Sequence, residues 1–209
     1  MYAIAGSSKQ FLLSGEHTSS DVKRFGQESP DLALIRAIAN GDKRAMHTLY
    51  MRHSVRVYRF ILRLINHSSL AEDLVSEVFL DVWRQAAEFR AKSQVSTWLL
   101  AIARNKALSA RRRRPHERLD ADALAMIVDP ADDPATAVEK KERAEVIQRC
   151  LSGLPSIHRE VLDLVYYHDN SVDEIATICA IPVGTVKTRM FHARNHLKNS
   201  LKMAGIDAF

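Results

Sequence analysis

Apolar residues recur every three or four positions along most of this 209-residue chain, and this spacing restricts the fold more than any other feature. The first such series is Leu32, Ile35, Ala39, Ala45, Leu49, Val57, Phe60, Ile61 and Leu64, with an Asn40-Gly41-Asp42 turn inside it. This period puts the apolar side chains on one face of a helix. Seven Gly and six Pro are few for a sheet-rich chain. We therefore expect an all-α fold built from antiparallel helices.

Residues 115–139 interrupt the pattern. Pro115, Pro130 and Pro134 lie among several aspartates there, and helical periodicity returns only with Val138, Ala144, Ile147 and Leu151. The interruption predicts two small helical domains joined by a flexible acidic linker. The expected divisions are a mobile tail at 1–27, a first domain at 28–114, the linker at 115–139, a second domain at 140–201 and a tail at 202–209.

The second domain contains the most informative motif of the sequence, at residues 171–198. Ser171 and Glu174 have the spacing of a capping box, which starts a helix by pairing its free amides. Residues 181–184, Ile-Pro-Val-Gly, interrupt that helix, and Thr185 is placed to cap the next one. A capped helix, a short turn and a second helix predict a helix-turn-helix.

The second of these helices has two different faces. Its apolar stripe is expected to pack inward and comprises Val186, Met190, Ala193 and Leu197. The opposite face carries Lys187, Thr188, Phe191, His192, Asn195 and Lys198. Cations and hydroxyls suit phosphates and base edges, and an aromatic ring suits a thymine methyl group. An ordinary solvated helix face is the alternative, and the helix-turn-helix context favours DNA.

The first domain contains an acidic helix at residues 71–83. Leu74, Val75, Val78 and Val82 fall on one side, whereas Asp73, Glu77 and Leu80 fall on another. In a basic chain of net charge +5, an acidic surface suits a protein partner better than nucleic acid. A solvated helix flank explains the same spacing.

A cationic stretch follows at residues 89–114. Polar residues at 89–97 predict a loop before a helix that starts near Ser96, with Leu99, Ile102, Ala103 and Lys106 along one side. Arg104, Asn105 and the run Arg111 to Arg114 supply polar and cationic groups. Such a run is often a solvated surface. Directly after an apolar helix it also makes a phosphate-binding site.

Four segments of the sequence together resemble the extracytoplasmic-function sigma factors of the sigma-70 family. GTVKTRMFHARNHL at 184–197, preceded by LPSIHREVLDLVYY at 154–167, is similar to region 4, which reads the minus-thirty-five promoter element. AEDLVSEVFLDVW at 71–83 and STWLLAIARNKAL at 96–108 are similar to region 2, which binds polymerase and melts the minus-ten element. The resemblance covers roughly residues 28–114 and 140–200, in the family's order.

The resemblance implies a role for each matching residue. The implied polymerase contacts are Asp73, Ser76 and Glu77. The implied minus-ten and melting residues are Lys92, Ser93, Gln94, Arg104, Asn105, Lys106, Arg111, Arg112, Arg113 and Arg114. The implied minus-thirty-five residues are Thr185, Lys187, Thr188, Phe191, His192 and Asn195, among which His192 replaces the family's usual Arg.

The resemblance implies a sigma factor that directs promoter-specific transcription, for a stress or environmental regulon, with core RNA polymerase, promoter DNA and an anti-sigma factor as partners. A helix-turn-helix regulator acting without polymerase is an alternative, but it explains only 171–198. A sigma-like mimic that sequesters an anti-sigma factor could lose its DNA-facing cations, and this chain keeps Lys187, Arg189 and Arg194.

We expect neither catalysis nor a bound cofactor. No H-E-x-x-H, P-loop or G-x-S-x-G pattern occurs in the sequence. Cys150 and Cys179 have no metal-binding spacing and are expected to be buried free thiols. No apolar run approaches the roughly 18 residues of a membrane span, and no signal-peptide pattern opens the chain, so we expect a cytoplasmic protein without membrane insertion.

Overall fold

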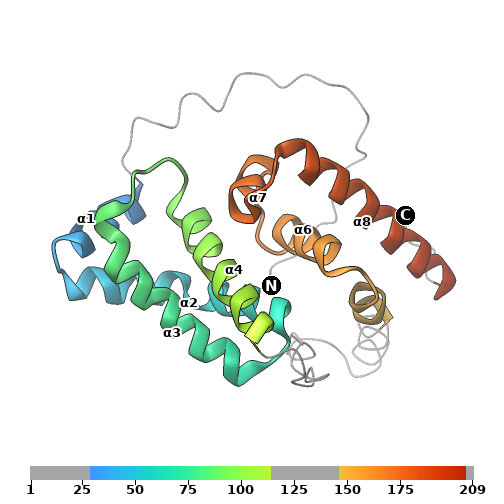
Figure 1. Cartoon of the computed structure of the whole chain (residues 1–209), viewed down its shortest axis with the longest axis horizontal. Coiled ribbons are helices and arrows are strands. Elements are labelled where there is room, and N and C mark those ends of the chain that lie inside the picture. Colours follow the sequence, from blue (N-terminus) through green and yellow to red (C-terminus); the bar gives the residue numbers. More distant parts are fainter. Residues whose placement is uncertain (1–28, 114–145, 206–209) are drawn as a thin grey trace, which may run out of the picture.

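Helices form every regular element in the described part of the chain, which comprises residues 29–113 and 146–205 of a computed structural model (Figure 1). The first stretch, the N-terminal module, contains α1 Pro30–Ala39, α2 Lys43–Ile65, α3 Ser68–Gln85, the 3-10 helix η2 Ala86–Glu88 and α4 Val95–Arg113. The second stretch, the C-terminal module, has a helical segment at 146–152, then α6 Ser156–Tyr166, α7 Val172–Cys179 and α8 Val183–Met203. The all-α expectation is confirmed.

The turn between α1 and α2 is the one that the sequence predicts. Asn40 ends α1, Gly41 takes a left-handed φ of +85°, and Asp42 precedes α2. The Asp42 carboxylate accepts hydrogen bonds from the backbone N–H groups of Arg44 at 2.7 Å and Ala45 at 3.1 Å. These bonds satisfy amides that have no partner inside the helix, so the turn also fixes where α2 begins.

The core of the N-terminal module lies where α2, α3 and α4 meet, with α1 packed on α2. Its centre is formed by fully buried side chains from all three helices, among them Phe60, Ile61, Val78 and Leu99. The four apolar residues that the sequence assigns to the inner side of the 71–83 helix are all buried: Leu74, Val75, Val78 and Val82. That prediction is confirmed.

The C-terminal module is a small bundle in which α8 packs on both α6 and α7. Val186 and Ala193 of the predicted inward stripe are fully buried, and Met190 and Leu197 pack partly buried against the same core. The capping box is present. The Glu174 backbone N–H donates to Ser171 Oγ at 3.3 Å, and the Ser171 N–H donates to a Glu174 carboxylate oxygen at 2.8 Å.

The prediction that Thr185 caps the last helix is wrong. The helix α8 already begins at Val183, with Pro182 as its extended N-terminal flank, and Thr185 lies inside the first turn. Ala180 ends α7 in the left-handed region, with φ near 53°. Because Pro182 holds its own φ near the helical value and keeps the preceding residue extended, the chain re-enters a helix at once.

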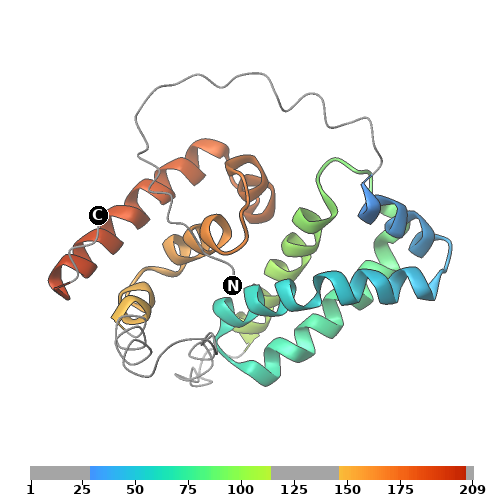
Figure 2. The same ribbon diagram turned by 180° about the vertical axis from the view of Figure 1, so that it is seen from behind.

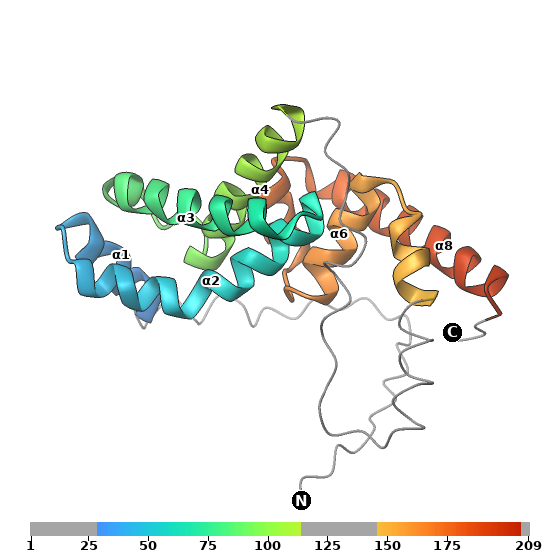
Figure 3. The ribbon, with the colours of Figure 1, turned by 90° about the horizontal axis from the view of Figure 1, so that it is seen from below.

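The two modules lie side by side, as Figures 2 and 3 show. Helix α4 packs against α7, and α2 contacts α6. Outside the described residues lie the predicted tail at 1–27, Arg114, the predicted linker at 115–139 and residues 206–209 of the predicted C-terminal tail. Lys202 and Met203, which the prediction gives to that tail, form the end of α8. The two cysteines are free, as expected, with Cys179 buried and Cys150 partly exposed.

We predict that Ser171→Ala lowers the free energy of unfolding by about 1 kcal/mol, because the α7 cap is lost. Urea denaturation followed by circular dichroism measures the change. Ser171→Thr is the matched control, because it keeps a hydroxyl acceptor and should stay within a few tenths of a kcal/mol. Equal stability of the Ala and Thr variants would contradict a capping role for this hydroxyl.

Candidate nucleic-acid and polymerase interfaces

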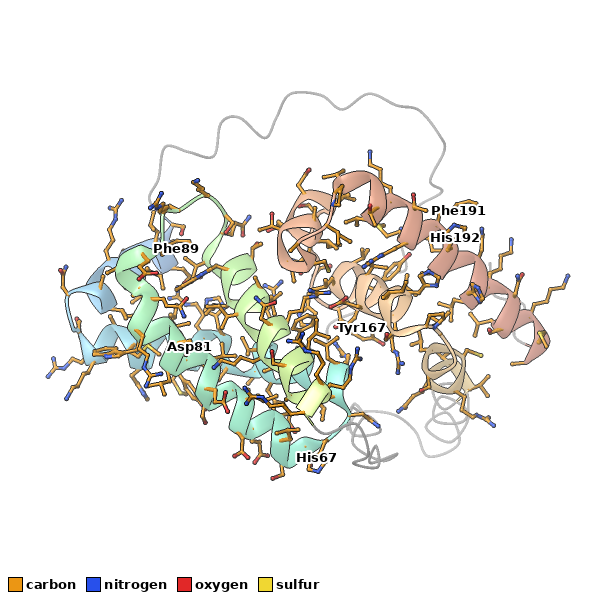
Figure 4. All side chains as sticks on the ribbon, in the orientation of Figure 1. His67, Asp81, Phe89, Tyr167, Phe191 and His192 are labelled. Atoms are coloured by element: carbon orange, nitrogen blue, oxygen red, sulfur yellow. The ribbon has the colours of Figure 1, made fainter. Side chains whose placement is uncertain are left out.

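The outer face of α8 is open to solvent. Lys187, Thr188, Phe191, His192 and Asn195 are all exposed, and 62% of Phe191 is accessible, which is unusual for a phenylalanine. Figure 4 labels Phe191 and His192 midway along α8. Thr185 is half-buried. Five of the six residues predicted for the minus-thirty-five element therefore share one accessible surface.

A shallow hollow of ≈ 270 Å³ lies on the same face. It is lined by Val172, Lys187, Met190, Phe191, Arg194 and Asn195. The Arg194 guanidinium lies 5.9 Å from the centre of the Tyr166 ring, which is itself exposed. The hollow thus brings together cations, an amide and exposed aromatic rings. These are the groups that contact phosphates and base edges of DNA.

Three histidines meet where α8 borders α6, and two of them, His192 and His196, are exposed. His158 of α6 lies beneath α8, with its ring centre 6.2 Å from that of His192 and 5.8 Å from that of His196. Burial lowers the pKa of His158, and the neighbouring His196, His192 and Arg189 lower it further. Protonation of His158 is therefore unfavourable in the folded chain.

The predicted polymerase contacts form a second exposed surface, on α3. Asp73, Ser76 and Glu77 are exposed on one side of this helix, and Leu80 extends the side with an exposed apolar side chain. This surface belongs to the N-terminal module, whereas the surface on α8 belongs to the other.

Lys106 lies against this acidic helix. Its Nζ is 2.9 Å from an Asp81 carboxylate oxygen and 3.2 Å from one of Glu77. The hydrogen bond to Asp81 raises the pKa of Lys106, with a further contribution from Glu77. The sequence assigns Lys106 and Glu77 to different surfaces, and the structure brings them together. Asp81, labelled in Figure 4, was missed, although it lies one turn after Glu77 on the same helix.

The predicted minus-ten loop connects η2 to α4. Lys92 and Gln94 are exposed in it, Ser93 is half-buried, and Ala91 takes a left-handed φ of 52°. The Phe89 ring packs on Trp98 of α4, with ring centres 4.8 Å apart, and so anchors the loop. Asn105 is exposed along α4, and Arg111, Arg112 and Arg113 are exposed at its far end. A 19-residue helix is about 28 Å long, so the loop and the arginines are far apart.

Arg104 is the predicted minus-ten residue whose surroundings differ most from the expectation. Its side chain is only 15% exposed and is directed at Glu160 of α6, in the other module. The guanidinium donates two hydrogen bonds to that carboxylate, from Nε at 2.6 Å and from Nη2 at 3.2 Å. The spacing of apolar residues along α4 does not indicate that Glu160, on another helix, lies against Arg104.

Two family models match the chain. The model for sigma-70 region 2 matches residues 49–116, and the model for sigma-70 region 4 matches residues 144–197. The two matches together span more than half of the chain and include α3, α4 and the helix-turn-helix.

The chain belongs to the sigma-70 family, in its extracytoplasmic-function group. It is 32% identical over 181 residues to the extracytoplasmic-function (ECF) RNA polymerase sigma factor SigK of Mycobacterium tuberculosis, covering 84% of this chain and 96% of that relative. It is 31% identical over 187 residues to the RNA polymerase sigma-H factor of Pseudomonas aeruginosa, covering 84% and 95%.

Two solved structures have the same fold. CnrH, solved with the cytosolic domain of CnrY, aligns with a TM-score of 0.63 at 23% identity, covering 85% of this chain and 99% of CnrH. RpoE of Bartonella quintana, solved with the anti-sigma factor NepR, aligns with a TM-score of 0.58 at 27% identity, covering 78% and 98%.

Membership in the family settles the general activity. This sigma factor directs transcription initiation together with core RNA polymerase and is not itself an enzyme. Within residues 29–113 and 146–205, no helix has both the length and the apolar character needed to cross a bilayer. The same residues contain no cluster of His, Cys, Asp and Glu able to hold a metal ion.

We predict that the histidine cluster makes this sigma factor acid-sensitive. A histidine whose pKa is lower in the folded chain takes up a proton on unfolding, so its contribution to stability is complete above the unfolded pKa of about 6.5. That contribution is lost as the pH falls from there towards the folded pKa. The urea midpoint of the wild type should therefore drop between pH 7.5 and 5.5, and His158→Gln should reduce the drop.

His47→Gln is the matched control, because His47 is exposed on α2, in the other module. It should leave the pH dependence of the urea midpoint unchanged. If His158→Gln and the wild type lose the same stability on acidification, the cluster is not the source of the acid sensitivity.

Proposed function

We propose that this sigma factor divides its work among three surfaces on two domains, region 2 at residues 28–114 and region 4 at residues 140–201. The acidic face of α3 docks on polymerase, the α8 face reads the minus-thirty-five element, and the 89–94 loop with α4 holds the minus-ten strand. The observation that carries this assignment is the exposure of Lys187, Thr188, Phe191 and Asn195 on the second helix of a helix-turn-helix.

The α3 surface suits a protein partner. Asp73 and Glu77 would repel phosphates, and Leu80 beside them adds exposed apolar area. Interfaces between proteins combine an apolar centre with charged groups at the rim, and complementary charge speeds docking. A cationic surface on polymerase is the partner that fits this chemistry.

The minus-ten surface combines a polar loop with cations along α4. Lys92, Ser93 and Gln94 are placed to contact an unpaired base, and Phe89 and Trp98 support them from behind. Asn105 and Arg111 to Arg113 follow along α4, in the direction in which a strand leaving the loop could run. Arg114 lies outside the described residues. Single strands bind to such grooves through phosphate contacts and stacking.

We further propose that an anti-sigma factor holds this chain inactive. The support is RpoE of Bartonella quintana, which was solved with the anti-sigma factor NepR. A mimic that only sequesters an anti-sigma factor would not need a DNA-reading face, and the exposed Lys187 and Phe191 favour a working sigma factor over a mimic.

In vitro transcription from matched genomic promoters with core polymerase tests the assignment. Asp73→Ala/Glu77→Ala should lower the affinity for core polymerase about tenfold or more and leave binding to the minus-thirty-five duplex unchanged. Lys187→Ala/Phe191→Ala should lower duplex binding about tenfold or more and leave polymerase binding unchanged. Both pairs should reduce promoter-specific transcripts.

Each pair of substitutions is the control for the other, and Lys202→Ala removes an exposed cation from the far end of the same helix without touching the proposed reading face. Full transcription by both pairs would refute the assignment. A loss of duplex binding by Lys202→Ala as large as that of the α8 pair would show that only net charge matters.

A further inference from the structure

The histidine cluster borders the proposed reading face of α8. We propose that His192 is a proton-dependent contact to a DNA phosphate, so that this sigma factor holds the minus-thirty-five element more tightly at mildly acid pH than at alkaline pH. The role of His192 rests on the proposed function, because it takes α8 as the helix that reads this element. It adds a condition to that function, since one contact forms fully only when an imidazole carries a second proton.

The position of His192 suits a phosphate better than a base. Its side chain is exposed on α8 (Figure 4), and its ring centre lies 6.2 Å from that of His158 on α6. His192 is therefore at the edge of the exposed face that borders α6, whereas Thr188 and Asn195 lie nearer the middle of that face. When a recognition helix lies in the major groove, the middle of its outer face meets base edges and the borders meet the backbone. The ring of His192 thus meets a phosphate oxygen.

The two edges of this face differ in how their charge responds to pH. Lys187 and Arg194 line the hollow at one edge, and Lys and Arg side chains stay charged throughout the neutral range. His192 and His196 lie one helical turn apart at the other edge, where both are exposed. Histidine is the side chain whose ordinary pKa, about 6.5, falls within that range. The charge of this second edge therefore depends on pH.

The titratable groups that face His192 within the described residues are a cation and two imidazoles. On α8 they are Arg189, three residues before it, and His196, four residues after it. On α6 the facing group is His158. No carboxylate in the described part of the chain forms an ion pair with any of these three histidines. The free chain thus offers His192 no counter-charge.

The carboxylates of the neighbouring helices are engaged elsewhere. On α6, Glu160 and Asp163 pair with arginines of the N-terminal module, and Arg159 neighbours a third arginine there. On α7, Glu174 is held by the helix cap, and within the described residues no ion pair joins Asp173 to a histidine. A phosphate of bound DNA is therefore the anion that stabilises a positive charge on His192.

His158 leaves the added proton to the exposed rings. Its Nδ1 is buried and has no hydrogen-bond partner among the described residues. A proton on this nitrogen would create a buried N–H group without an acceptor, which is costly. Burial lowers the pKa of His158, and the neighbouring imidazoles and Arg189 lower it further. His158 therefore stays neutral and packs beneath α8 while His192 becomes charged.

Protonation and DNA binding are linked through this contact. A phosphate beside an imidazole favours the charged ring, so the complex holds more protons than the free chain and the free DNA together. The affinity for DNA consequently rises as the pH falls, by at most about tenfold per pH unit for each proton taken up.

The test measures the affinity of the full-length chain for a fluorescent duplex that carries the minus-thirty-five element of a matched genomic promoter. At constant salt, the wild type should bind about fivefold more tightly at pH 6 than at pH 8. His192→Gln should bind weakly at both pH values, because its side chain is never charged. His192→Arg, whose charge is fixed, should bind tightly at both.

Controls separate His192 from the other histidines. His47→Gln, exposed on α2 of the other module, should keep the full response to pH. His196→Gln removes the second imidazole of the same edge and should keep most of the response. His192 is exposed, so its variants should fold like the wild type, and circular dichroism at each pH checks this.

Salt dependence tests whether the contact is made to a phosphate. Each phosphate contact steepens the fall of log affinity with log salt by about 0.9. The slope of the wild type should therefore be steeper by nearly this amount at pH 6 than at pH 8. His192→Arg should show the steep slope at both pH values, and His192→Gln the shallow one.

A wild-type response to pH that persists in His192→Gln would overturn the proposal, and so would a response that vanishes in His196→Gln instead. Equal salt slopes of the wild type at the two pH values would overturn the phosphate contact. If Lys187→Ala/Phe191→Ala leaves duplex binding unchanged, the α8 face is not the reading face and the proposed function fails. If that pair abolishes binding while the His192 variants behave like the wild type, only the role of His192 fails.

Discussion

Arg104 and Glu160 carry opposite charges that are both largely out of water, and their pair joins α4 of the N-terminal module to α6 of the C-terminal module. Removing one partner of a buried pair typically costs about 3–5 kcal/mol, because the other charge is left without compensation. The contact is therefore intolerant of substitution at either partner.

Much of the fold follows from local rules, and the sequence predicts that part well. The spacing of apolar residues places Val78 and Val186 correctly in the core, and the capping rule places the Ser171–Glu174 box correctly at the start of α7. Both predictions succeed because each depends on residues within about one helical turn. The start of α8 was missed because Pro182 overrides the capping preference of Thr185. The Lys106–Asp81 and Arg104–Glu160 pairs were missed because helical period assigns a residue to a face and does not say which other helix lies against that face.

The residues proposed to bind outside partners and those that bind each other overlap in this sigma factor. Lys106 neutralises part of the acidic α3 surface, and Glu160 neutralises part of the cationic α4 surface. Small helical modules have little interior, so their charged residues lie close to one another and readily serve more than one partner. Polarity on a surface of such a chain does not by itself identify an external ligand, and the site of each charge has to be considered together with its neighbours.

The burial of the Arg104–Glu160 pair sets how the chain responds to ionic strength. Phosphate contacts made in solvent release counterions and weaken steeply as salt is added, whereas a pair held away from water is screened far less. The Arg104–Glu160 pair therefore keeps its strength at salt concentrations that weaken contacts between exposed cations and phosphates.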